Sequence, residues 1–195
     1  MSAAGRVCTG FSKPYVATYA ASQGTVTYSN GQLLARGVSV DVQPDVASDD
    51  NIFYADNVAA ETVGGKFTGG TVTLTVDGLL DAARKLVYGL PTAGSDGFYV
   101  FGDDQDIPYV GIGFVARFMS DVVTSYVPII LAKCRFKEPN VSASTQEDDI
   151  EWQTEELEAS VLRDDSSNHV WKLMGEAQTT EAAAEAKIKT KFNIS

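Results

Sequence analysis

A chain of 195 residues with 44% hydrophobic and 21% charged side chains has the composition of an ordinary folded domain and can bury a sizeable core. Its 26 acidic and 15 basic side chains give a formal net charge of −11, which disfavours a protein that grips DNA through its phosphates. No apolar run approaches the roughly 18 residues that a membrane helix needs. The N-terminus also lacks the apolar segment of a signal peptide, so we expect one domain, made and kept in a cytoplasm.

Most of the chain alternates apolar and polar residues, which is the pattern of half-buried β-strands. The segments with this pattern or with a long apolar run are 25–35, 36–44, 69–77, 108–119 and 124–139. Asn30-Gly31 lies between two short apolar segments and favours a hairpin turn. Pro128 indicates a bulge or a sheet edge in the last segment. Residues 148–164 and 169–175 flank a polar turn and predict a C-terminal hairpin.

Helical patterns are scarce. Leu79, Ala83, Leu86 and Leu90 follow one another at spacings of four, three and four, which predicts a short helix over about 79–88. Asp77 is suited to cap its start, and Gly89 is suited to end it. An alanine-rich segment at 179–189 predicts a second helix near the C-terminus, which packs or frays. The expected fold class is therefore mainly β, an antiparallel β-sandwich or barrel with one short flanking helix.

The division of the chain follows from these patterns. We expect an N-terminal arm at 1–24, a β-sandwich domain at 25–176 and a C-terminal extension at 177–195. Residues 43–66 form a long irregular connection between two well-patterned strands. Connections of this length without secondary structure are uncommon in compact domains and often carry function.

The residues with reactive side chains do not form a recognisable catalytic or cofactor site. His169 is the only histidine, and it lies in the expected C-terminal hairpin. Cys8 and Cys134 have no spacing for zinc, and a disulfide between them is not expected in a reducing compartment. Calcium is the one metal to consider, because three acids gather at 103–106, but their spacing does not match an EF-hand loop. We expect no enzyme activity, no cofactor and no metal.

The order of several features together resembles one family. The valine-rich "VSVDVQPD" leads to "NIFYADN", then to "AAETVGGK" and to "GGTVTLTVDGL", which runs into a short helix ending in "YGL". A long apolar strand follows, then the acidic "SASTQEDDIEWQTEELEASVL" and the tryptophan-containing "HVWKLM". Over roughly residues 25–175 the chain resembles the major tail protein of long non-contractile-tailed bacteriophages, the subunit of the tail tube.

The resemblance implies a structural role in the virion. Subunits of this family form hexameric rings that stack into a hollow tube, and DNA passes through the lumen without specific binding. The implied partners are other copies of the chain and the tape-measure, tail-tip or baseplate, and tail-terminator proteins. The implied location is the virion tail, assembled in the cytoplasm of the host bacterium, with no membrane partner.

Two sets of residues follow from the resemblance. The long loop is expected to contact a neighbouring subunit or ring through Asp49, Asp50, Ile52, Phe53, Tyr54, Asp56 and Asn57. Glu151, Glu155 and the other odd-numbered acids of their strand are expected to face the lumen. Fixed negative charge there would hold DNA phosphates off the wall.

Three alternatives remain open at this stage. A tube subunit of a contractile tail or of a secretion machine would share the fold, and a capsid decoration protein is a further structural role. A calcium- or carbohydrate-binding β-sandwich module belongs to another functional class, and it would be favoured if Asp103, Asp104 and Asp106 bound metal.

Overall fold

The computed structural model describes residues 5–47, 51–55, 58–63, 66–91, 96–102, 105–121, 123–139 and 153–194, with the backbone alone described at 51–55 and 58–63. It confirms the prediction of a mainly β chain with an antiparallel sheet and a short helix. The main sheet contains β1 (Val7–Ser22), β2 (Thr25–Leu33), β3 (Gly37–Val46), β6 (Phe67–Val76), β7 (Val110–Ser120), β8 (Val123–Phe136), β9 (Glu155–Leu162) and β10 (Lys172–Met174).

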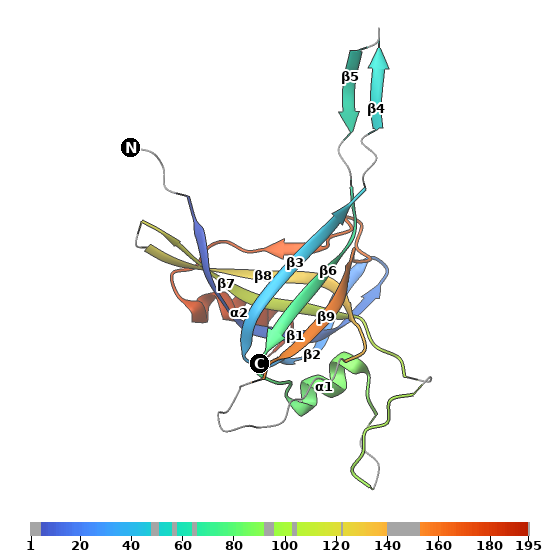
Figure 1. The fold of residues 1–195 in the computed structure, drawn as a ribbon, viewed down its shortest axis with the longest axis vertical. Coiled ribbons are helices and arrows are strands. Elements are labelled where there is room, and N and C mark those ends of the chain that lie inside the picture. Colours follow the sequence, from blue (N-terminus) through green and yellow to red (C-terminus); the bar gives the residue numbers. More distant parts are fainter. Residues whose placement is uncertain are drawn as a thin grey trace.

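The main sheet curls so that its two halves face each other. Its strand order is β2-β1-β7-β8-β9-β6-β3, with β10 paired to β8. Figure 1 shows β3, β6 and β9 crossing in front of β1, β7 and β8. Apolar side chains of both halves, such as Leu74 and Leu157 from one and Ile112 and Leu131 from the other, form one buried core between them. The alternation seen in the sequence thus gives each strand an inner apolar face.

The first helix, α1 (Asp81–Tyr88), closes one end of this core. Ala83 and Val87 on one side of the helix are fully buried, as the predicted apolar stripe requires. Gly89 ends the helix in the left-handed conformation, as predicted. The cap predicted at Asp77 is wrong, because that carboxylate instead accepts hydrogen bonds from the backbone N–H and the side chain of Arg36.

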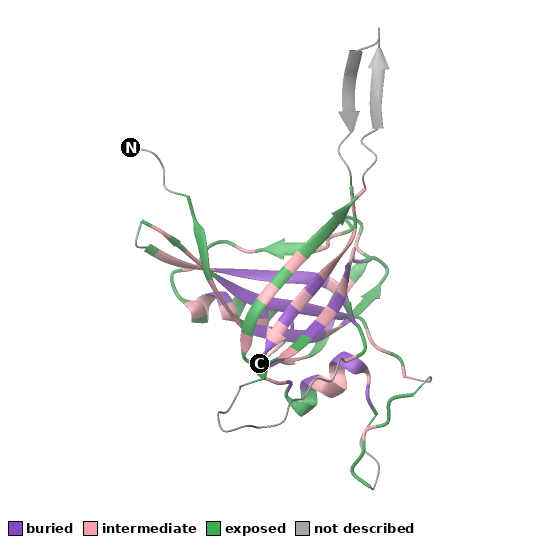
Figure 2. Cartoon of the chain, in the orientation of Figure 1, coloured by how far each residue is buried: buried purple, intermediate pink, exposed green. Residues whose placement is uncertain are grey.

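The second helix, α2 (Glu181–Lys191), covers the outer face of β1, β7 and β8 and forms a second core. Its buried residues Ala184 and Ile188, together with Phe192, pack with tyrosines of β1 and β2. Gly113 of β7 makes this packing fit, because a Cβ there would lie 2.6 Å from Ile188 Cγ2. β7 is buried at every position from Val110 to Ala116, which Figure 2 draws as a continuous purple segment, and its residues belong to both cores. The C-terminal segment is therefore part of the packed fold.

Two predicted hairpins are wrong. Asn30-Gly31 lies inside β2, where it forms an irregularity against β1, and a Cβ at Gly31 would collide with Ile194. The turn between β1 and β2 is instead at Gln23-Gly24, where both residues have positive φ. The predicted C-terminal hairpin is absent from the described residues, because β9 and β10 both pair with β8 rather than with each other.

The expected N-terminal arm and the expected long loop also differ from the fold. Most of residues 1–24 belong to β1, which lies inside the sheet between β2 and β7 and has Val16 and Ala17 fully buried. The long connection contains a separate two-stranded sheet, formed by β4 (Asn51–Ala55) and β5 (Val58–Val63). Figure 1 draws β4 and β5 apart from the main sheet.

Candidate assembly surfaces

The side chains that could support chemistry do not converge. In the described part of the chain, no group of three or more His, Cys, Asp or Glu side chains is placed to hold a metal. Asp103 and Asp104, considered for calcium, lie outside the described residues. Cys8 is exposed and Cys134 is buried, and both are free. Burial raises the pKa of the Cys134 thiol far above its usual range, as expected for a thiol in an apolar core. Neither described helix is long and apolar enough to span a membrane.

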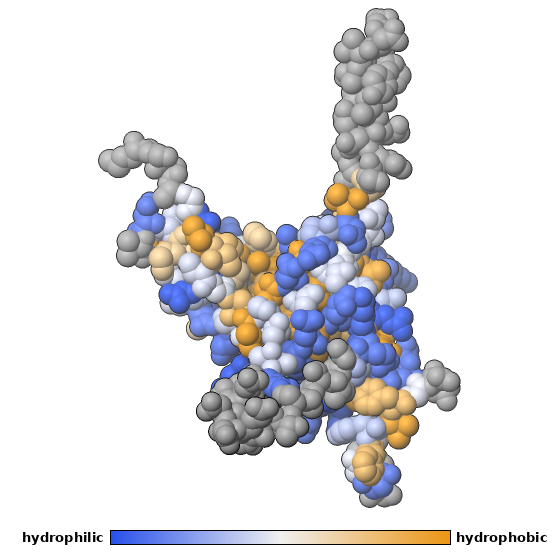
Figure 3. All heavy atoms as spheres, in the orientation of Figure 1, coloured by the Kyte–Doolittle hydropathy of each residue, from blue (hydrophilic) through white to orange (hydrophobic). Residues whose placement is uncertain are grey.

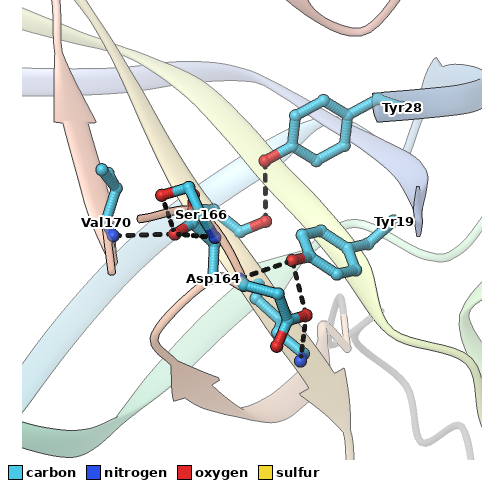
Figure 4. A network of polar contacts seen from close by, with 8 residues as sticks. Tyr19, Tyr28, Asp164, Ser166 and Val170 are labelled. Carbon is cyan, nitrogen blue, oxygen red and sulfur yellow. Dashed lines mark hydrogen bonds and ion pairs between the residues drawn. The ribbon is translucent and has the colours of Figure 1, made fainter. Parts of the chain in front are cut away.

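The most developed polar cluster anchors the connection between β9 and β10 to the sheet (Figure 4). Asp164 is buried, and its Oδ1 accepts hydrogen bonds from the Ser166 hydroxyl at 2.6 Å and from the Val170 N–H at 2.8 Å. The Asp164 N–H donates to the Val170 carbonyl, so the loop closes on itself. This closure returns the chain to β8 as a second, separate strand, which explains why the predicted hairpin does not form.

The neighbouring carboxylate, Asp165, joins this loop to β1 and β8. The Tyr19 hydroxyl donates to Asp165 Oδ2 at 2.8 Å and accepts from the Asp165 N–H at 2.9 Å. Lys133 Nζ lies 2.8 Å from the same carboxylate oxygen. Burial is the main cause that raises the pKa of Tyr19 to about 12, while the hydrogen bond from Lys133 lowers the pKa of Asp165. Because these groups satisfy one another, the cluster serves as a structural anchor.

The outer face of β3, β6 and β9 carries acidic, hydroxyl and amide side chains in cross-strand rows. Its cross-strand rows are Ser39–Thr75–Glu156, Asp41–Thr73–Glu158 and Gln43–Thr71–Ser160. We call these nine residues the acidic face. None of the three strands contains a lysine, an arginine or a histidine. Figure 3 shows a largely hydrophilic surface over these strands.

Only one of the two predicted lumen acids can be placed. Glu151 lies outside the described residues. Glu155 starts β9 with its side chain toward α1: its Oε2 accepts a hydrogen bond from the Leu79 N–H at 3.0 Å and lies 3.3 Å from Arg84 Nη2. The other odd positions of β9, such as Leu157, are buried in the core. The outward acids of β9 are therefore the even-numbered Glu156 and Glu158, and a lumen position for Glu155 stays a prediction.

Only part of the predicted inter-subunit loop can be placed. Ile52, Phe53 and Tyr54 belong to β4, where their backbones pair with β5. Asp49, Asp50, Asp56 and Asn57 lie outside the described residues. The role of this loop in contacts between subunits therefore stays a prediction.

Edge strands offer a second kind of surface. β3 ends the sheet order, so among the described residues only β6 pairs with it. Val38 and Val46 at the two ends of β3 are 56% and 61% exposed. A sheet edge with unpaired backbone groups is a template for pairing with another chain.

Comparison with known proteins does not assign the chain: no protein-family model and no curated protein matches it.

Proposed function

We propose that this chain is the tail tube subunit of a long non-contractile-tailed bacteriophage, a structural protein that polymerises as stacked hexameric rings around a DNA-conducting lumen. The observation that carries the proposal is the acidic face. Three adjacent strands present Asp41, Glu156 and Glu158 between hydroxyl side chains, and they carry no positive side chain at all.

A wall of this composition suits the conduction of DNA. Proteins that bind DNA tightly neutralise phosphates with lysine and arginine and release counterions. The acidic face is negatively charged, as phosphates are, so it repels phosphates and the DNA stays mobile along the wall. The nearest described cation, Lys137 after β8, is already paired with Glu158.

The free edge of β3 suits polymerisation. Contacts between different surfaces of neighbouring copies generate a ring when the rotation closes, and stacked rings then give a tube. The acidic face borders β3, so a sheet that continues from copy to copy at β3 would bring the acidic faces of the copies next to one another.

The test is electron microscopy of the purified full chain at rising concentration, combined with sedimentation. The expected result is rings and tubes of uniform bore. A chain that stays monomeric at high concentration and whose melting temperature rises on addition of calcium would overturn the proposal in favour of the binding module. Tubes that contract or that require a sheath partner would assign the chain to a contractile machine instead.

A further inference from the structure

A three-stranded arm extends the sheet beyond both cores. It consists of three segments: residues 6–10, which include the start of β1; residues 117–121, which include the end of β7; and residues 123–125, at the start of β8. Val7 pairs with Met119, and Val123 pairs with Ser120, with an irregularity between Cys8 and Gly10. Among the described arm residues, only the partly buried Phe118 packs against a core. Figures 1 and 2 show this part projecting from the body, next to the N-terminal end, with exposed and half-buried residues only.

The arm exposes apolar side chains on two of its strands. Val7 is 65% exposed and Val123 is 68% exposed. Since β2 pairs with β1 only from Tyr15 onward, the edge of β1 at Val7–Gly10 has a strand on its β7 side and no described strand on the other. Because only Phe118 connects the described arm to a core, the rest of the arm is available to pack against another surface.

The arm is also basic, in a chain whose net charge is −11. Arg6 and Arg117 are both exposed, and neither forms an ion pair with a described residue. Asp121 in the turn is the only acid among the described arm residues. The arm therefore needs an occupant that is acidic, partly apolar and able to pair with a strand edge.

The C-terminal half of β3 has these properties. Val46 is 61% exposed, Asp45 beside it is exposed, and no positive side chain lies in the strand. β3 is the last strand in the sheet order, and no described strand pairs with its outer edge, although Gly37 at its start lies against Phe11 of β1. Figure 1 shows β3 running away from the arm toward the opposite end of its own molecule, so the arm and this part of β3 are separate surfaces of one chain.

We propose that the arm of one copy docks on the C-terminal half of β3 of a second copy. Val7–Gly10 extends the neighbour's sheet at β3, Val7 packs near Val46, and Arg117 faces Asp45. Because one surface meets a different surface, the contact is head-to-tail and repeats around a closed ring. The inference rests on the proposed function and names the two surfaces that would join its subunits.

The first experiment reverses the two charges separately. Arg117→Glu and Asp45→Arg are each expected to abolish assembly measured by sedimentation and electron microscopy, since like charges then meet at the contact. An equimolar mixture of the two variants is expected to restore assembly, because each copy then offers a charge that its neighbour complements. Lys187→Glu, on the exposed side of α2, is the matched control and should assemble as the unsubstituted chain does.

The second experiment measures proximity directly. In a Cys8→Ser background, Val7→Cys with Val46→Cys should form an intermolecular disulfide under mild oxidation, whereas Val7→Cys with Ser167→Cys should not. Melting curves confirm that the variants are folded. The inference is overturned if the mixture fails to assemble although both single variants are folded, if both single variants assemble normally, or if the two cysteine pairs cross-link equally. If any of these outcomes occurs while the unsubstituted chain still forms rings, only the proposed contact is wrong, and the proposed function stands.

Discussion

Two glycines of β7 decide whether the C-terminal helix can lie on the sheet. We predict that Gly113→Ala destabilises the fold by about 1–3 kcal/mol, because the new methyl group would overlap Ile188 and the Phe192 ring in a filled core. Urea unfolding measures this loss, and near-ultraviolet circular dichroism reports the displaced aromatic rings.

A matched substitution in the neighbouring strand separates packing from strand propensity. Gly10 of β1 has only the side chain of Arg117 near its would-be Cβ, at 3.6 Å and beyond. Gly10→Ala should therefore leave stability unchanged or slightly raised. Equal losses for both variants would show that α2 does not pack on Gly113 as described.

Tyr88 makes the fold sensitive to alkali. Burial is the main cause that raises the pKa of Tyr88 to about 12, whereas a tyrosine in the unfolded chain ionises near 10. Its contribution to stability is thus complete below about pH 10 and is lost as the pH rises toward 12. In Tyr88→Phe the free energy of unfolding should fall less steeply between pH 10 and pH 12. Parallel curves for the two proteins over that range would contradict the assignment.

At the scale of elements, α2 depends on the buried side chain of Phe192 at its C-terminal end. Helix propensity alone is not enough, because an isolated helix of this length is marginal in water. Phe192 is fully buried among Tyr28, Gly111 and Gly113. Phe192→Ala should cost about 3–5 kcal/mol, as is usual for a buried phenylalanine. Hydrogen exchange should accelerate first in residues 181–191. The neighbouring exposed Lys191→Ala serves as the control, and equal exchange in both variants would argue against this role of Phe192.

The elements also show how far the sequence predicts the fold. Alternation along β3, β6 and β7 and the apolar spacing of α1 are local signals, and the structure has these strands and this helix. Pairing between distant segments is not local. The place of β1 between β2 and β7 depends on contacts about a hundred residues apart, which no single window reveals.

The two wrong hairpins have different causes. Asn30-Gly31 has the local signature of a turn, but Gly31 is required because Ile194 approaches its backbone. The polar turn after β9 has the signature of a hairpin, but Asp164 closes it into a loop that leads back to β8. For the candidate surfaces, composition indicated an acidic protein, whereas the register of β9 was needed to show that Glu156 and Glu158 face outward and that Glu155 is bound to α1.

At the scale of the whole molecule, charge is distributed unevenly over the chain. The acidic face lies on β3, β6 and β9, and α2 with its lysines lies on the outer side of the opposite layer. If the acidic face lines a tube, DNA that binds to lysines introduced on that face would be enclosed. DNA that binds to lysines introduced on the outside of the tube would stay accessible. This difference allows the orientation of the subunit to be tested.

The corresponding prediction compares two triple variants in assembled tubes. The variant that combines Asp41→Lys, Glu156→Lys and Glu158→Lys should form tubes that retain duplex DNA. Its affinity for DNA should fall steeply with salt, because each neutralised phosphate steepens the plot of log affinity against log salt concentration by roughly 0.9. That DNA should resist nuclease, because it lies in the lumen. The control variant changes the exposed acids Asp81, Asp106 and Glu176 to lysine, and DNA bound to it should be digested. Digestion of the DNA held by the first variant, in tubes that are intact by electron microscopy, would place the acidic face on the outside of the tube.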